Sequence, residues 1–258
     1  MSSSVLLARE GDVATVTLNR PDRLNAVDLA MWERLAEVAR ALAADDAVRC
    51  VIVKGAGKGF GAGADISEFE TVRGTPETAQ DYGAVMVDAL FALRDCPKPT
   101  VAQIHGACTG AGLEIAVMCD LRIAARSARF GVPIQKLGVT MPYPELGAFL
   151  ELVGRATLLE ILLEGRVFDA EEALAKRLVT RVVDDADLET EVAATVRRIA
   201  DGAPLGHAFH KRATRRLIDG GKLTPEEFAE GYASCASADY RIGVEAFLAK
   251  QKPKFLGR

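Results

Sequence analysis

Two glycine-rich segments that each lead into small residues have the residue types and spacing to do chemistry. The first, Gly55 to Gly63, leads into Ala64, and the second, His105 to Gly110, leads into Ala111. A short apolar run precedes each loop and a helix start follows it, and the first turn of a helix leaves backbone N–H groups without partners. Small residues let a ligand oxygen approach the main chain closely. The N–H groups of Ala64 and Ala111 are therefore predicted to converge as an oxyanion hole.

Glu114 is the acid best placed to act beside these donors. It follows Ala111 by three residues, so a helix places its carboxylate about one turn along the same face. The surrounding stretch, Leu113 to Met118, is apolar, and burial without a partner raises a carboxyl pKa. We therefore predict that Glu114 carries a proton in the reaction. The alternative is that Glu114 is a structural acid paired with an arginine such as Arg122. Asp120 is expected to end the helix and cap local backbone.

Phosphate binding, the first use that glycine-rich loops suggest, requires spacings that are absent. A dinucleotide fingerprint needs glycines at positions one, three and six, but the sixth position counted from Gly55 is Phe60. A P-loop needs Gly-Lys followed by Ser or Thr, and Lys58 is followed by Gly59. The loops therefore predict another use of backbone N–H groups.

A cysteine nucleophile is a second alternative. Gly106 to Gly110 has the form Gly-x-nucleophile-x-Gly around Cys108, and His207 or His210 could act as its base. Free cysteine is often buried and inert, so Cys108 is expected to pack as a small hydrophobe under the loop. The two histidines have no visible third partner and are expected to form a surface pair.

Short strands and helices must position these groups. Alternating β-branched residues predict a strand over Val13 to Leu18, and Asp28 is the predicted N-cap of a helix through about Ala43. Further predictions are strands over 50–53, 100–104, 121–124 and 129–131 and a helix over 76–95. Beyond about Gly147 only helices are predicted, including 188–200, 204–218, 225–236 and 240–250. The expected fold is an α/β core of repeated strand-strand-helix units over residues 1–190, followed by a helical region, 191–258, that seals an oligomer.

Composition excludes several classes of protein. The chain has 258 residues, 49% of them hydrophobic, which is enough for one large core and argues against disorder. The net charge is −4 without a basic stripe, so no nucleic acid partner is expected. The local basic run, Lys211, Arg212, Arg215 and Arg216, is expected to be a solvated helix face.

Nothing in the sequence predicts a membrane, disulfide or metal site. No run approaches the roughly 20 apolar residues of a transmembrane helix, and the segment Met1 to Ser4 lacks a signal-peptide pattern. The cysteines have neither pairwise nor metal-ligand spacing: Cys50, Cys96, Cys108, Cys119 and Cys235. We expect reduced, buried thiols and a cytoplasmic location.

Five segments in order resemble those of the enoyl-CoA hydratase/isomerase family, also called the crotonase family. They are Asn19 to Ala26, Gly57 to Ile66, His105 to Ala116, Arg129 to Pro133, and Glu245 to Arg258. The resemblance spans nearly the whole chain and implies a spiral of strand-strand-helix turns, assembled as homotrimers often stacked into hexamers. It also implies an acyl-coenzyme A thioester as substrate, with its carbonyl oxygen on the N–H groups of Ala64 and Ala111. No other cofactor is expected, because coenzyme A arrives with the substrate.

The same resemblance assigns residues that bind the substrate. Arg23, Leu24 and Ala26 should line the nucleotide end of coenzyme A, and Ala62, Asp65 and Ile66 should flank its pantetheine arm. Gly110, Pro133, Ile134 and Tyr143 are assigned to the same site. Phe247 and Lys250 match tail positions that reach toward the coenzyme A of a site, their own or a neighbouring subunit's.

One position departs from the family's pattern. Hydratases of the family carry a second glutamate just after the Phe-Gly-x-Pro segment, and its isomerases usually carry a carboxylate there as well; this chain has Ile134. The altered segment that follows, Thr140 to Glu145, offers Glu145 or Tyr143 as substitutes, and Glu68 is a third. The alternative for each is a solvated residue.

The sequence therefore predicts an acyl-CoA enzyme, with hydration of a 2-enoyl-CoA or the reverse dehydration as its first interpretation. Two alternatives stay open. One is another single-acid reaction of the family, by an isomerase, hydratase-lyase, decarboxylase or thioester hydrolase. The other is a catalytically weakened acyl-CoA-binding paralogue.

Overall fold

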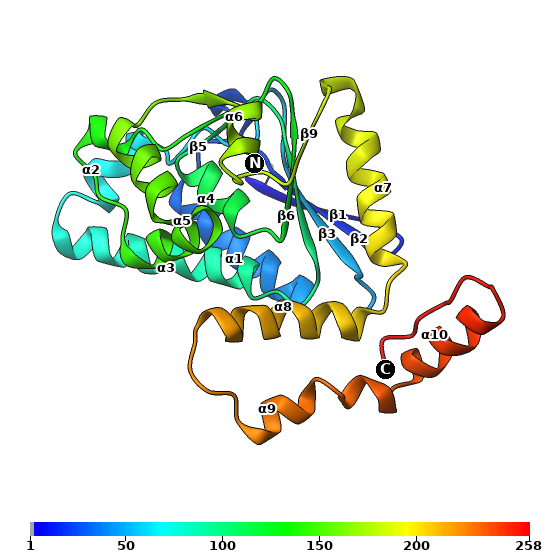
Figure 1. Ribbon diagram of the computed structural model, residues 1–258. Helices are drawn as coiled ribbons and strands as arrows, with labels where there is room; N and C mark the ends of the chain where they lie inside the picture. The colour runs from blue at the N-terminus through cyan, green and yellow to red at the C-terminus, as the bar shows by residue number, and fades with distance from the viewer. Residues whose placement is uncertain (1–2) are drawn as a thin grey trace.

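A six-stranded sheet runs through the centre of the molecule (Figure 1). The structure is a computed structural model, and it describes residues 3–258. Its strands lie in the order β1 (Val5–Glu10), β2 (Val13–Leu18), β3 (Cys50–Gly55), β4 (Thr100–Ile104), β6 (Leu121–Ala125) and β9 (Arg181–Val183). β1 pairs with β2 antiparallel, and the other neighbours pair in parallel. Parallel neighbours need crossover connections, so the intervening helices lie on the sheet.

A second, smaller sheet accompanies the first. It contains β5 (Ala107–Thr109), β7 (Arg129–Gly131) and β8 (Phe168–Asp169). β5 pairs in parallel with β7, and an isolated bridge joins Gly61 to Cys108 at its edge. Two turns of chain thus pass through the large sheet, the small sheet and a helix, in β4–β5–α4 and β6–β7–α5. The predicted strand-strand-helix spiral is confirmed.

Local signals start the helices where the sequence predicts them. The Asp28 side chain accepts a hydrogen bond from the N–H of Met31 (2.8 Å) and begins α1. The α-helices are α1 (Leu29–Ala44), α2 (Phe69–Val72), α3 (Pro76–Arg94), α4 (Ala111–Val117), α5 (Tyr143–Glu164), α6 (Ala170–Ala175), α7 (Leu188–Ala200), α8 (Pro204–Ile218), α9 (Pro225–Glu230) and α10 (Ala238–Leu248). Short 3₁₀ turns are η1 (Pro21–Arg23), η2 (Ile66–Glu68), η3 (Ile134–Leu137), η4 (Asp185–Asp187) and η5 (Ala233–Ala236). Among residues 3–258, no helix has both the length and the apolar character to cross a membrane.

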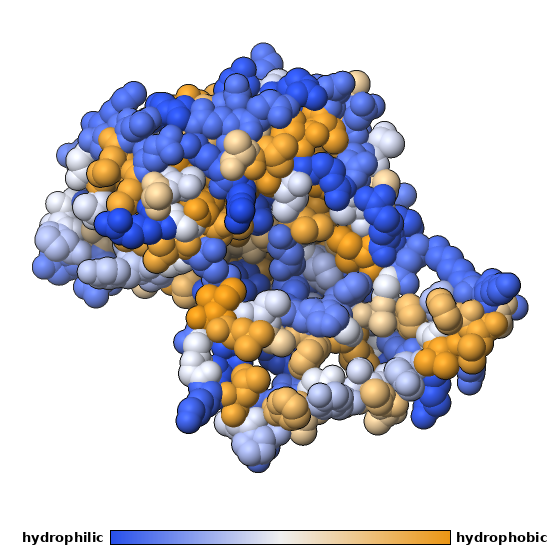
Figure 2. Space-filling model, viewed as in Figure 1, coloured by the Kyte–Doolittle hydropathy of each residue, from blue (hydrophilic) through white to orange (hydrophobic). Residues whose placement is uncertain are grey.

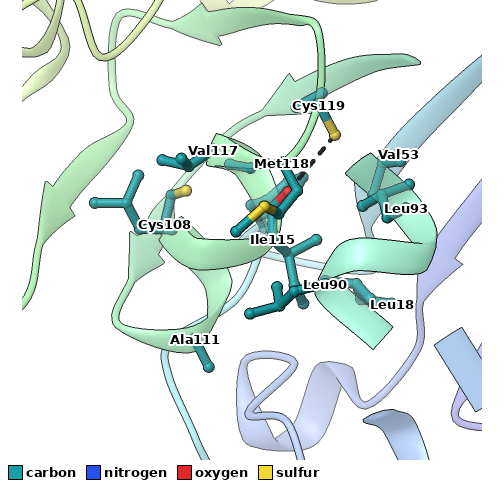
Figure 3. Close-up of a cluster of buried hydrophobic side chains, with 14 of the residues drawn as sticks. Leu18, Val53, Leu90, Leu93, Cys108, Ala111, Ile115, Val117, Met118 and Cys119 are labelled. Atoms are coloured by element: carbon teal, nitrogen blue, oxygen red, sulfur yellow. Dashed lines mark hydrogen bonds between the residues drawn. The ribbon is translucent and has the colours of Figure 1, made fainter. Parts of the chain in front are cut away.

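Helix α4 lies in the middle of the main core. All seven of its residues are buried, and Figure 3 shows Ile115 pointing toward Leu90 of α3 and Leu18 of β2. A helix that is apolar on every side has to be enclosed by protein. Close packing holds such a helix in one position, so whatever α4 carries at its N-terminus is fixed relative to the sheet.

The opposite face of the large sheet is covered by α7. Val192 and Val196 of this helix pack against Cys50, Val101 and Ile123 of three neighbouring strands. The last residue of the buried hydrophobic clusters is Ala200 at the end of this helix. Helices α8 to α10 follow along the lower side of the molecule in Figure 1. The division of the chain at residue 190 stays a prediction.

Helices α8 to α10 expose many apolar side chains. Figure 2 shows hydrophobic surface over this part of the molecule. The large exposed residues are Leu205, Leu217, Ile218, Leu223, Phe228, Tyr232, Tyr240, Val244, Phe247 and Leu248. The chain's end returns to the core, where Arg49 donates to the carbonyl of Phe255 (3.2 Å). An apolar surface of this kind is typical of a protein interface.

The prediction of helices alone beyond Gly147 is wrong, because β8 and β9 are strands. Both are short, and their partners β7 and β6 come much earlier in the chain. Strand β5 was not predicted either, because it lies in a segment expected to be loop. Side-chain periodicity carries little signal over two or three residues, so pairing with distant segments decides these strands.

Three surface predictions also need correction. The basic run is paired rather than only solvated, since Lys211 contacts Asp120 (2.6 Å) and Arg215 contacts Asp95 (2.6 Å). Asp120 caps the distant strand β4 through the N–H of Thr100 (2.7 Å) rather than its own helix. Of the five cysteines, Cys235 is exposed and the other four are buried.

Candidate active site

Two chain segments run side by side and end in Ala64 and Ala111. The N–H of Gly61 donates to the carbonyl of Ala107, and the N–H of Thr109 donates to the carbonyl of Gly61, each at 2.9 Å. Because this pairing is parallel, both segments continue in the same direction. The residue three positions after Gly61 and the residue two positions after Thr109 therefore lie at the same end of the pair.

A glycine precedes each of these alanines and turns the chain. Gly63 has φ +117° and Gly110 has φ +47°, values that residues with a side chain rarely adopt. A Cβ on Gly110 would lie 3.4 Å from the Cα of Gly63, so the two turns are in contact. In the described part of the chain, the N–H groups of Ala64 and Ala111 have no hydrogen-bond acceptor. The structure thus brings together the two donors predicted from the sequence.

The loop that carries Ala64 is tied to the start of α1. The Asp65 carboxylate accepts hydrogen bonds from Ser67 Oγ (2.6 Å) and from the Arg20 guanidinium (2.7 Å), which also pairs with Asp28 (3.1 Å). The Ser67 and Arg20 hydrogen bonds lower the pKa of Asp65 to about 2. Asp65 therefore fixes Ala64 through its carboxylate, and its predicted contact with pantetheine stays a prediction.

Asn25 holds the entrance to the same loop, a role that the sequence did not reveal. Its backbone has φ +58°, and the residue is fully buried. Its amide nitrogen donates to the carbonyls of Ala56 and Gly59, each at 2.8 Å, and its oxygen accepts from the N–H of Arg20 (2.8 Å). Asparagine tolerates left-handed backbone better than other non-glycine residues, and this was the available signal.

A cavity of about 130 Å³ lies beside the two donors. Its wall is mostly apolar, with Glu114, Glu145, Arg73 and Tyr82 as the ionisable members. The predicted site residues that line it are Ala62, Ala64, Ile66, Gly110, Ala111, Glu114, Pro133 and Ile134. A mostly apolar cavity with a few convergent polar groups is the usual form of a small-molecule site.

Glu114 projects into this cavity from α4. It is 8% exposed, and burial, followed by the charge of Glu145, raises its pKa to about 8 against the opposing charge of Arg73. The alternative pairing with Arg122 is wrong, because that guanidinium donates to the carbonyls of Leu178 (2.8 Å) and Cys119. Glu114 is therefore protonated at neutral pH and can give a proton.

Helix α3 and the turn before it add residues to the cavity wall that the sequence did not single out. Trp32 Nε1 donates to Tyr82 Oη (2.9 Å), which leaves the phenolic proton of Tyr82 free to donate. The Arg73 guanidinium lies over the rings of Phe69 (5.0 Å) and Tyr82 (5.4 Å). Within residues 3–258, Arg73 forms no ion pair. The helical spacing of Tyr82 and Met86 was the available signal.

The three candidate substitutes for a second glutamate have different positions. Glu145 is fully buried and lines the cavity. Tyr143 is 89% exposed and does not line the cavity. The structure therefore does not bring it into the site as the sequence predicted. Glu68 accepts a hydrogen bond from the N–H of Leu29 (3.0 Å) at the start of α1. Only Glu145 is available beside Glu114.

Comparison with known proteins decides the family. The sequence profile of the family described as Enoyl-CoA hydratase/isomerase matches residues 8–258. The chain belongs to this family. It is 33% identical to the 1,2-epoxyphenylacetyl-CoA isomerase of Escherichia coli (strain K12), with 100% of both chains covered, and 33% identical to the short-chain-enoyl-CoA hydratase of Clostridium acetobutylicum, with 97% of this chain and 96% of the relative covered. The crystal structure of an enoyl-CoA hydratase/carnithine racemase from Magnetospirillum magneticum matches with a TM-score of 0.98 at 50% identity, covering 100% of this chain and 97% of that one.

The predicted coenzyme A contacts fall into two groups. Arg23 and Leu24 are exposed at η1, and the carbonyl of Leu24 accepts from the N–H of Ala62 (3.0 Å), so η1 adjoins the cavity wall. The carbonyl of Ala26 accepts from Arg20 (2.6 Å). The second group lies elsewhere: Phe247, 83% exposed on α10, and Lys250 just beyond it are far from α4 and α5 (Figure 1). The chain therefore does not bring them to its own cavity, and their contact with the coenzyme A of a neighbouring subunit stays a prediction.

The cysteine alternative does not fit the structure. Cys108 is fully buried under the loop, as its packing role predicts, and burial raises its pKa well above the ordinary value. His207 Nε2 lies 3.0 Å from the carbonyl oxygen of Ile199, and this histidine is half-buried, so the predicted surface pair is wrong for it. Both histidines line a different hollow, beside α8. No group of three or more His, Cys, Asp or Glu able to hold a metal ion occurs over residues 3–258.

The contact between Gly61 and Gly112 predicts a severe effect of one methyl group. A Cβ on Gly112 would lie 2.1 Å from the carbonyl oxygen of Gly61, which cannot move without breaking its pairing with Thr109. We expect Gly112→Ala to lower the melting temperature by at least several degrees, measured by thermal denaturation. In the matched control, Gly147→Ala, the new Cβ meets nothing within 4 Å in a helix, and the melting temperature should stay or rise. Equal melting temperatures for both variants would contradict the contact.

The raised pKa of Glu114 predicts how stability depends on pH. Its pKa rises from 4.5 to about 8 on folding, so the folded state binds the extra proton and this stabilisation is lost as pH rises from about 4.5 to 8. Each pKa unit corresponds to about 1.4 kcal/mol, so the free energy of unfolding should fall on the order of 4 kcal/mol relative to Glu114→Gln over this range. Urea denaturation of both proteins at several pH values measures the difference. Parallel curves would contradict it.

Proposed function

We propose that this protein hydrates short-chain 2-enoyl-CoA thioesters and catalyses the reverse dehydration of 3-hydroxyacyl-CoA. The observation that carries the proposal is the convergence of two unpartnered N–H groups, at Ala64 and Ala111, on a cavity that holds the buried acid Glu114. Addition of water to the β carbon puts negative charge on the thioester oxygen, and two fixed donors stabilise that charge. The carboxyl of Glu114 supplies the proton that the α carbon then needs. Coenzyme A arrives as part of the substrate, and no further cofactor is required.

The size of the cavity supports a short acyl chain. Its volume is about 130 Å³, and an apolar cavity of about 150 Å³ in another protein holds one benzene molecule. An acyl group of about four to six carbons therefore matches the space. Leu137 and Met141 contribute to the wall that would limit longer chains.

The test is turnover of a series of 2-enoyl-CoAs from four to ten carbons, followed by loss of the conjugated thioester and by mass spectrometry of the product. We expect 3-hydroxyacyl-CoA, formed fastest from the short members. Glu114→Gln should lower kcat by roughly 10²- to 10⁴-fold because the proton is lost, while acyl-CoA still binds.

The control is Glu151→Gln, which changes an acid of α5 outside this cavity and should leave turnover unchanged. An active Glu114→Gln variant would refute the role of that residue. A wild-type protein that shifts the double bond without adding water would identify an isomerase instead. If it binds acyl-CoA and converts no member of the series, the hydratase proposal fails.

We also propose that the apolar side chains of α8 to α10 are covered in a homotrimer or in a hexamer of two trimers. Phe228 on α9 is 62% exposed, and the surface continues over α10. Light scattering should give a mass of three or six chains, and Phe228→Asp should shift it toward one chain. Leu7→Asp, at an exposed apolar residue on strand β1, is the control and should leave the mass unchanged. A monomeric wild type would contradict this assembly.

A further inference from the structure

Glu145 is a buried acid that the reaction described so far does not use. It lies in the first turn of α5 and is 0% exposed. Neither carboxylate oxygen has a hydrogen-bond partner among residues 3–258. An unpartnered buried carboxyl group destabilises a fold, and buried polar groups normally have partners, so an exception calls for an explanation. A functional site is the usual place where such a cost is retained.

The position of Glu145 supplies that explanation. It lines the same cavity as Glu114, and its charge raises the pKa of Glu114. Burial raises the pKa of Glu145 as well, against the opposing charge of Arg73. The charged and titratable side chains around this cavity come from three further elements: Arg73 after α2, Tyr82 on α3 and Glu114 on α4. Two carboxyl groups so placed favour holding one proton between them.

We propose that Glu145 is the second catalytic acid–base residue of the hydration reaction, supplying from α5 the carboxylate that η3 lacks at Ile134. This inference rests on the proposed function. Ionised Glu145 takes a proton from water while the water oxygen forms a bond to the β carbon. The electron pair of the double bond moves to the α carbon, and the negative charge reaches the thioester oxygen between the N–H groups of Ala64 and Ala111.

The second half of the reaction uses Glu114. Its carboxyl proton passes to the α carbon, and the thioester carbonyl re-forms. Glu145 is now protonated and Glu114 ionised, so transfer of one proton from Glu145 to Glu114 restores the starting state. Water has been added, and no other reactant is consumed.

The roles of the two carboxyl groups can be distinguished by measuring two reactions. Exchange of the α protons of butyryl-CoA with deuterium from D₂O needs only Glu114 and the two N–H donors, whereas hydration needs both acids. We expect Glu145→Gln to lower the rate of crotonyl-CoA hydration at least 100-fold and to retain exchange within about tenfold of wild type. Its exchange profile should move to lower pH, because removing the charge of Glu145 lowers the pKa of Glu114.

Two further variants keep the test independent of folding. Glu145→Leu should be at least as thermally stable as wild type, because the unpartnered carboxyl is replaced by an apolar group of similar size, and it should not hydrate. Adding Ile134→Glu to Glu145→Gln should restore part of the hydration rate. Glu151→Gln on the same helix is the control with unchanged rates.

The outcomes are distinct. Hydration by Glu145→Gln at the wild-type rate would refute the role of Glu145 and leave the proposed function standing. Loss of both hydration and exchange in a folded Glu145→Gln protein would assign Glu145 a structural role and refute the proposal as well. A wild-type protein that exchanges α protons but hydrates no enoyl-CoA would refute the proposed function, and the role of Glu145 in hydration with it.

Discussion

The contact of main chain with main chain at Gly61 and Gly112 is the constraint from which the site follows. A Cβ on Gly112 would overlap the carbonyl of Gly61, so glycine alone permits the approach of α4 to the first loop. That approach places the N-terminus of α4 beside the turn at Gly63. Since α4 is buried on all sides and the first loop pairs with the segment before α4, the core and this pairing together set the distance between the two N–H donors. A fixed pair of donors does not have to reorganise when charge develops on a bound oxygen, and such preorganisation is a large part of electrostatic catalysis.

The same core imposes the electrostatics of the cavity. The environment of Glu114 is apolar because its helix, α4, is enclosed by the core. Desolvation is the largest cause of its raised pKa. Arg73 opposes this shift from a position over two aromatic rings, with no carboxylate paired to it in the described chain. A buried acid near pKa 8 is a poor contributor to stability and a good proton donor at neutral pH. The fold thus gives up stability at the position where the proposed reaction requires a proton.

The sequence reveals the groups whose positions depend on nearby residues. Asp28 caps its helix as predicted, and Ala111 and Glu114 could be placed because α4 starts directly after the second loop. The helix start predicted at Ala64 is wrong, because Ala64 pairs with Val27 and precedes the 3₁₀ turn η2. Tyr82 and Arg73 could not be placed, since their presence in the wall depends on how α3 crosses the core. The strands β8 and β9 were not predicted for a related reason. Each is two or three residues long and forms only by pairing with a distant strand. Local patterns predict local structure, and distant packing completes the site.

In the proposed reaction the second carboxylate comes from α5 and not from η3, and this position affects how it ionises. Glu145 is in the first turn of α5, a helix that is interrupted at Gly154, and the unpaired N–H groups of this helix start favour a negative charge. Burial and the charge of Glu145 raise the pKa of Glu114 to about 8. Of two carboxyl groups that share one proton, the one at the helix N-terminus is then the one that ionises and can accept a proton, and the one in the core is the one that stays protonated and can give a proton. In the proposed reaction, the N-terminus of α5 therefore favours proton transfer from water to Glu145. A carboxylate at position 134 would lie on the short turn η3 and would lack this α-helix start.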